Sequence, residues 1–165
     1  MLDATADISD DLGDAARIAA PGFTDYGGLT RFSGPITTVK CFEDNSLVRE
    51  ALQEPGQGRV LVVDGGGSMR CALLGDILAT LAADNGWTGV VVNGCIRDSA
   101  EIKTIQVGVK ALATHPMKSH KYGEGRRDVA VQFAGIKIAP GEYLYADTDG
   151  IIITSQALQA SEVNP

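Results

Sequence analysis

The sequence predicts a single α/β domain with a mixed, partly parallel sheet and a β-rich C-terminal half. Two nearly continuous apolar runs, Arg59–Asp64 and Gly89–Asn93, are typical of strands buried on both faces of a sheet. A helical pattern ending near Gly86 lies between them, so the two strands should be parallel and joined by a right-handed crossover. From Val129 onward, short β-rich segments alternate with glycine and aspartate turns.

The segments before this unit are predicted from their apolar spacing and from the glycines and prolines that bound them. Helical spacing predicts helices, and β-branched runs predict strands. In order, they are an amphipathic helix at Thr5–Ala19, a strand at Leu29–Phe32, a turn at Ser33–Pro35, a strand at Ile36–Phe42, and a helix that Asp44 caps and that ends at Gln53.

The segments after the unit are shorter. They are a helix at Arg97–Ile105 and strands at Val109–Thr114, Val129–Phe133, Ile136–Ile138, Tyr143–Ala146 and Ile151–Thr154. The 165 residues suit one core, and neither a repeat nor a low-complexity linker divides them. We therefore expect one domain over residues 1–165, with residues 1–4 and 156–165 as loose ends.

Composition excludes several classes of function. The formal net charge of -7 repels phosphate backbones and anionic membranes, so neither a nucleic acid nor a membrane is an expected partner. Cys41, Cys71 and Cys95 are isolated from one another and from histidine, which argues against a disulfide framework or a structural zinc site. The N-terminus is acidic and no apolar run approaches about 18 residues, so the expected location is the cytoplasm.

The glycine-rich loop Asp64–Ser68 follows the first buried strand. Such a loop can hold a nucleotide or S-adenosylmethionine, but no Gly-Lys-Ser/Thr follows as in a P-loop. The second strand ends in Asn93-Gly94, where a ribose-binding site would need an acidic residue. A tight turn that forms a pocket wall is the favoured interpretation.

Two further segments could carry chemistry. Gly75–Leu78 lies at or near the start of a helix, where free N–H groups and the helix dipole can hold a carboxylate or phosphate. Arg97, Asp98 and Glu101 follow the second buried strand, where the two carboxylates suit Mg²⁺ or Mn²⁺ and the arginine suits a substrate anion. Each segment alone is more typical of an ordinary helix start. If the two buried strands are neighbours, however, both segments meet at one edge of the sheet.

Together the two segments resemble a known family. Asp76, twenty intervening residues and Arg97-Asp98-x-x-Glu101 match the D-x20-R-D-x2-E/D signature of 4-hydroxy-4-methyl-2-oxoglutarate/4-carboxy-4-hydroxy-2-oxoadipate aldolases. Gly34–Asn45 and Arg59–Ser68 strongly resemble the RraA-like group, named after the regulator of ribonuclease E activity. The likeness extends from about residue 5 to residue 155.

The resemblance implies a swivelling β/β/α-type fold, a homotrimeric ring with active sites at the subunit interfaces, and one divalent cation, Mg²⁺ or Mn²⁺. Asp98 would bind the metal directly, Arg97 would contact the substrate, and Asp76 and Glu101 would bind metal-held waters. The backbone amides that would hold the substrate carboxylate are those of Gly75, Asp76, Ile77 and Leu78. Some regulators of the group lack the residue matching Asp98, so its presence favours an enzyme.

The expected reaction is cleavage of a small 2-oxo acid to pyruvate. A water held by Asp76 or Glu101 would remove the 4-hydroxyl proton, and Arg97 together with the metal would stabilise the pyruvate enolate. Oxaloacetate decarboxylation should accompany cleavage, because it passes through the same enolate. Two rivals remain: a regulator that binds and inhibits ribonuclease E, and a methyltransferase. No motif supports a Schiff-base mechanism through Lys40, Lys110 or Lys137.

Overall fold

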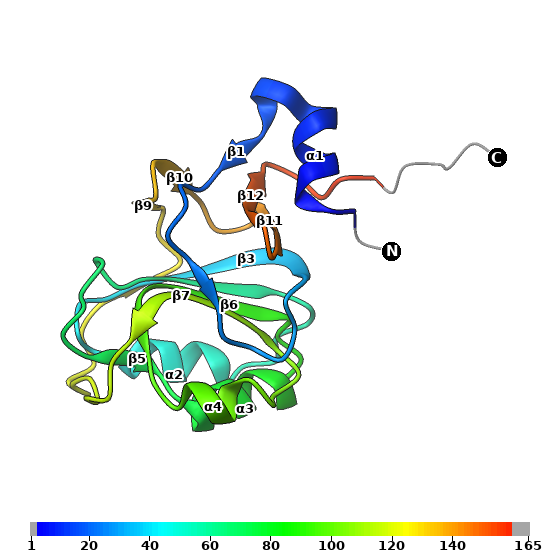
Figure 1. The fold of residues 1–165 in the computed structure, drawn as a ribbon. Coiled ribbons are helices and arrows are strands. Elements are labelled where there is room, and N and C mark those ends of the chain that lie inside the picture. The colour runs from blue at the N-terminus through cyan, green and yellow to red at the C-terminus, as the bar shows by residue number, and fades with distance from the viewer. Residues whose placement is uncertain (1–2, 160–165) are drawn as a thin grey trace.

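The computed structural model describes residues 3–159, and four strands run parallel at the centre of its main sheet (Figure 1). They are β3 (Phe32–Lys40), β4 (Val60–Asp64), β6 (Gly89–Ile96) and β7 (Gly108–Thr114), paired in that order. β4 and β6 are therefore adjacent and parallel, as the two apolar runs predict. A helix lies between them in sequence, so the predicted strand–helix–strand unit is confirmed.

Three helices cover one face of these strands (Figure 1). They are α2 (Ser46–Leu52), α3 (Asp76–Asp84) and α4 (Ser99–Ile102). Buried side chains on alternate positions of the strands, among them Val63 and Val92, pack against the helices in the larger core cluster. The helical face of the sheet is thus a closed apolar core.

The C-terminal strands cover the opposite face, as the β-rich half of the sequence predicts (Figure 1). β9 (Val131–Phe133) and β10 (Ile136–Ile138) form a hairpin, and β11 (Tyr143–Asp147) and β12 (Gly150–Thr154) extend the sheet antiparallel from β3. Parallel centre and antiparallel extension make this the predicted mixed sheet. Leu158, within the expected loose end, donates its N–H to the Tyr145 hydroxyl, while residues 1–2 and 160–165 lie outside the described range.

The helix predicted at Thr5–Ala19 is wrong in its second half. α1 (Thr5–Leu12) ends in a 3₁₀ turn, η1 (Gly13–Ala15), and β1 (Arg17–Ile18) then pairs antiparallel with β12. Arg17 also forms an ion pair with Glu142 at 2.7 Å. The helical spacing continues through Ile18 by coincidence, because pairing with a distant strand fixes this segment as an edge strand.

The turn predicted at Ser33–Pro35 does not exist. β3 runs unbroken through these residues but changes partner: residues 32–35 pair antiparallel with β11, and residues 36–40 pair parallel with β4. Pro35 has no N–H, and it lies where the pairing with β4 has not yet begun. Gly34 is also required, because a Cβ there would overlap the carbonyl oxygen of Gly58.

Three very short strands escape prediction because they have too few residues for an apolar period. They are β2 (Thr24–Asp25), β5 (Ala72–Leu74) and β8 (Arg126–Arg127), which pair with β7, β6 and β3. Among residues 3–159, no helix has the length and apolar character that crossing a bilayer requires.

Asp44 holds two segments together instead of capping α2 directly. The N-cap residue is Asn45, and the buried carboxylate of Asp44 accepts N–H bonds from Ser46, Tyr122 and Glu124 at 2.9, 2.7 and 3.3 Å. Burial acts most strongly and raises the pKa of Asp44, but the bonds from these residues together outweigh it and hold the pKa below its usual range. Asp44 therefore fastens residues 122–124 to the start of α2.

Gly34→Ala should lower the free energy of unfolding by about 3 kcal/mol, because the new methyl group overlaps a backbone oxygen that cannot move freely. Urea denaturation measures the change. Gly150→Ala is the matched control in β12, since its Cβ would meet nothing within 4 Å, and it should change stability by less than about 1 kcal/mol. Equal effects of the two substitutions would contradict the close approach of Gly34 to Gly58.

Asp44→Asn should destabilise the fold by about 2 kcal/mol at neutral pH, since charged hydrogen bonds to three amides are weakened. Because the pKa of Asp44 is lower in the folded chain, its contribution is present above about pH 4 and is lost as pH falls through the lowered value. The stability difference from wild type should therefore shrink in acid. Asp10→Asn on α1 is the control. A stability difference between Asp44→Asn and wild type that does not shrink in acid, or an equal destabilisation by Asp10→Asn, would argue against this role.

Candidate functional site

Two cavities open near the carboxyl ends of the parallel strands, where α/β sheets commonly bind ligands. The smaller, about 90 Å³, contains the residues of the Gly75–Leu78 and Arg97-Asp98 segments. The larger, about 580 Å³, contains none of them. Size favours the larger cavity, but the smaller one joins a helix N-terminus, an arginine and two carboxylates. We therefore take the smaller cavity as the candidate active site.

The position of the α3 N-terminus follows from β5. This strand pairs with the last residues of β6, so that Ala72 faces Cys95 and Leu74 faces Ile96. The chain then turns at Gly75, the N-cap of α3. The N–H of Arg97 bonds to the carbonyl oxygen of Leu74 at 2.9 Å, which fixes the end of β6 beside the start of the helix.

Asp98 lies directly against the α3 N-terminus. Its Oδ2 accepts the N–H of Asp76 at 3.2 Å, and a Cβ on Gly75 would stand only 2.7 Å from the same oxygen. Asp98 also has φ 58°, a left-handed conformation that aspartate tolerates better than most residues. The absence of a side chain at Gly75 and the left-handed backbone at Asp98 thus both allow the Asp98 carboxylate to lie close to the start of α3.

The free amides of the helix start already face carboxylates. Asp98 accepts the Asp76 N–H, and the Asp76 side chain accepts the N–H of Ile77 at 2.9 Å. These groups lie in the first turn, where the positive end of the helix dipole favours negative charge. A ligand carboxylate would therefore meet a position that is built for an anion.

Arg97 is held loosely on the same side, with its guanidinium 3.4 Å from the Pro116 carbonyl oxygen. Glu101 stands apart from this group: it lies exposed on α4 and is absent from the cavity lining. The structure thus brings together Gly75, Asp76, Ile77, Leu78, Arg97 and Asp98, and leaves Glu101 outside.

Several lining residues are missed by sequence reasoning. They come from α2 and from the loop after β7, and they are Asn45, Arg49, Lys118, Ser119 and Lys121. The only local signal is the basic character of residues 115–121, which by itself is typical of a solvated loop. Their cations join Arg97 in the lining, so positive charge outweighs the two carboxylates and the cavity suits an anionic ligand.

The residues present fit a water-rich Mg²⁺ or Mn²⁺ site. Among residues 3–159, no group of three or more His, Cys, Asp or Glu side chains could hold an ion. A hard cation such as Mg²⁺ needs only one or two protein carboxylates and fills its other positions with water and substrate. Asp98 is the carboxylate placed to do this, beside Asp76.

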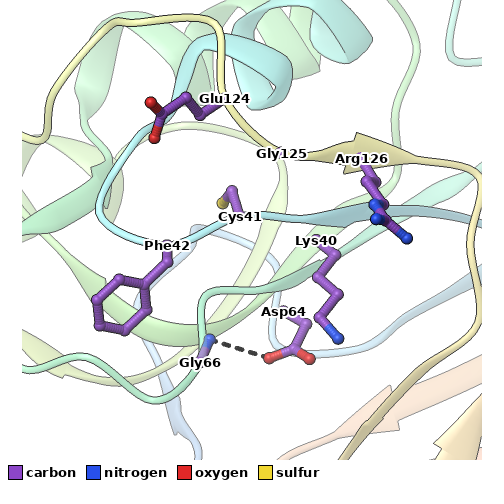
Figure 2. Close-up of a pocket in the computed structure, with 8 residues that line it drawn as sticks. All are labelled: Lys40, Cys41, Phe42, Asp64, Gly66, Glu124, Gly125 and Arg126. Carbon is purple, nitrogen blue, oxygen red and sulfur yellow. Dashed lines mark hydrogen bonds between the residues drawn. The ribbon is translucent and has the colours of Figure 1, made fainter.

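The glycine-rich loop belongs to the larger cavity, shown in Figure 2. Asp64 accepts the N–H of Gly66 at 3.0 Å, and Gly66 and Gly67 have positive φ values of 66° and 70°. The loop is therefore a tight turn that forms part of the cavity wall, which is the interpretation the sequence favoured.

Comparison with known proteins supports the resemblance. Residues 5–153 match the family model described as RraA-like, aldolase/RraA. A relative from Alkalilimnicola ehrlichii, named "Putative 4-hydroxy-4-methyl-2-oxoglutarate aldolase", is 65% identical over 93% of this chain and 96% of its own. A relative of the same name from Laribacter hongkongensis is 58% identical over 93% of this chain and 97% of its own.

Two solved structures have a TM-score of 0.93 to this chain. The RNA-processing inhibitor RraA from Thermus thermophilis is 43% identical and covers 98% of both chains. A Geobacillus kaustophilus protein, named as an S-adenosylmethionine:2-dimethylmenaquinone methyltransferase, is 51% identical over 94% of this chain and 97% of its own. The names of these relatives differ, but their sequences and folds agree: the chain belongs to the RraA-like, aldolase/RraA family.

Proposed function

We propose that this chain is a divalent-metal-dependent aldolase that cleaves 4-hydroxy-4-methyl-2-oxoglutarate to pyruvate and also decarboxylates oxaloacetate. The observation that carries the proposal is the meeting of the α3 N-terminus with Arg97 and Asp98 in one cationic cavity. The names of the Alkalilimnicola and Laribacter relatives support it.

Substrate binding would begin at the helix start. The carboxylate of the 2-oxo acid would accept the amides at Asp76 to Leu78, taking the place that Asp98 Oδ2 occupies on the Asp76 N–H. Asp98 would then be free to act as the direct metal ligand, and a bound Mg²⁺ or Mn²⁺ would supply Lewis acidity at the keto oxygen. Arg97 would face the same oxygen, where it can stabilise developing negative charge.

Bond cleavage then needs one proton acceptor and one proton donor. A water held by Asp76 would take the 4-hydroxyl proton as the carbon–carbon bond breaks, and the bonding electrons would pass into the pyruvate enolate. The former hydroxyl carbon becomes the keto carbon of the second pyruvate, and return of the proton from the same water to the enolate carbon releases the first. We assign this water to Asp76 because Glu101 lies outside the cavity lining, where it could act only through further water.

We also propose the homotrimer with interfacial active sites that the family resemblance implies. Large apolar side chains are exposed at the small cavity or next in sequence to residues that line it. Ile77, which lines the cavity, is 68% exposed, and Met117 and Tyr122, the neighbours of Lys118 and Lys121, are 59% and 73% exposed. Side chains of this kind gathered beside one cavity are typical of a surface that another protein covers. A second copy placed there would also shield the cavity from water.

Asp98→Asn tests the assignment most sharply, because asparagine keeps the shape and tolerates the left-handed backbone at this position. Pyruvate release from oxaloacetate and from 4-hydroxy-4-methyl-2-oxoglutarate should depend on Mg²⁺ or Mn²⁺, stop with EDTA, and fall about 100-fold or more in the variant. Asp128→Asn is the matched control, because Asp128 has a similar φ of 56° but is absent from the cavity lining. It should keep wild-type turnover. Turnover that Asp98→Asn leaves intact would contradict the proposed metal ligand.

A regulator of RNA processing is the second candidate, favoured by the 43% identity to the Thermus RraA structure. Its predicted readout is inhibition of ribonuclease E by direct binding, which needs no metal. The same Asp98→Asn protein separates the candidates, because such inhibition should survive the substitution whereas aldol cleavage should not. Absence of any turnover with several divalent ions, together with such inhibition, would favour the regulator.

A further inference from the structure

The larger cavity carries a row of polar side chains that the proposed reaction does not use. Sheet register places Arg126 opposite Lys40, Lys40 opposite Asp64, and Asp64 opposite Asn93. Val63 and Val92, their neighbours in sequence, point into the helical core, so Asp64 and Asn93 point to the other face. The row therefore crosses four strands on the face that the C-terminal strands leave open at this edge.

Two cations in this row lack partners. Neither Lys40 nor Arg126 forms a side-chain hydrogen bond or ion pair with any residue in the range 3–159. Arg127, next to Arg126, instead forms ion pairs with Glu50 of α2 and with Glu54, just after that helix, on the helical side of the sheet. Figure 2 shows Lys40 and Arg126 together on one side of the cavity. Their charges are thus available to an anionic group.

Asp64 offers a complementary acceptor. Its side chain is buried, with only 7% exposed, and Oδ1 takes both the Gly66 N–H and the Asn93 side-chain N–H at 3.0 Å. Oδ2 has no partner among the described residues, and Figure 2 shows it turned toward the Lys40 side of the cavity. A carboxylate that is held in place through one oxygen and presents the other to the cavity favours a ligand N–H or O–H donor.

The remaining walls are largely apolar. Phe42 presents a ring that is 58% exposed, on the side of the cavity away from the two cations (Figure 2). Burial, and then the charge of Asp44, raise the pKa of Cys41 to about 12, so its thiol stays neutral and acts as a small apolar surface. Glu124 and Asp64 together offset the charges of Lys40 and Arg126, so the lining as a whole has no net charge.

We propose that this cavity is a binding site for an α-amino acid with an apolar side chain. The ligand carboxylate would bridge Lys40 and Arg126, its ammonium group would donate to Asp64 Oδ2, and its side chain would lie against Phe42 and Cys41. A lining with no net charge that presents two cations beside a carboxylate acceptor matches a zwitterion better than a dianion. The site is separate from the aldolase cavity, with which it shares no lining residue.

Isothermal titration of the full chain with L-leucine tests the proposal, with 4-methylpentanoate and 3-methylbutylamine as probes that lack the ammonium and the carboxylate group. L-Leucine should bind saturably, and each analogue should bind at least about 10-fold more weakly, because each loses a charge-assisted contact. Lys40→Met and Arg126→Gln should each weaken L-leucine binding by about 10-fold or more. Lys137→Met on β10 removes the same charge away from the cavity and should bind as wild type.

Four results would overturn the proposal: no saturable binding of L-leucine, L-valine or L-phenylalanine; wild-type affinity in both Lys40→Met and Arg126→Gln; equal affinity for L-leucine and 4-methylpentanoate; or a crystal structure of the oligomer in which a second copy fills this cavity. Thermal unfolding checks that each variant is folded, and the two separate variants guard against one failing to fold. Asp98→Asn should bind L-leucine like wild type, so failure here is distinguishable from failure of the aldolase assignment.

Discussion

Parallel pairing of β4 with β6 is the constraint on which the candidate site depends. The register runs from Val60 opposite Gly89 to Asp64 opposite Asn93, so both strands end at the same edge of the sheet. The helix that follows β4 and the loop that follows β6 are therefore brought together. A slip of one residue in either strand would turn the side chains of that strand to the other face and bury Asp64 or Asn93 against the helices.

Local apolar pattern predicts the elements whose burial alone decides their structure. The near-continuous runs of β4 and β6 are of this kind, and so are most of the later strands. Pattern fails where a distant partner decides: Arg17–Ile18 is a strand because of β12, and Ser33–Pro35 is extended because β3 passes from one neighbour to the other. Neither partner can be read from residues close in sequence.

The residues of the candidate site likewise fall into those that local sequence predicts and those that distant contacts place. Gly75–Leu78, Arg97 and Asp98 are predictable because a signature spacing and two adjacent strands join them. Arg49 and Lys118 are not predictable from the sequence. Arg49 reaches the cavity from α2, and Lys118 reaches it from a loop that the buried Asp44 holds further along, at Tyr122. The row of side chains in the larger cavity likewise requires the register of β8 against β3, which two residues of sequence cannot reveal.

The central claim is that an oxo-acid carboxylate and a divalent cation meet between the α3 N-terminus and Asp98. Anomalous diffraction from crystals grown with Mn²⁺ and oxalate, a mimic of the pyruvate enolate, measures this directly. We predict a manganese peak bound by the Asp98 carboxylate, with oxalate on the amides at Asp76 to Leu78 and facing Arg97. A manganese peak elsewhere, or oxalate bound only in the larger cavity beside Lys40, would contradict it.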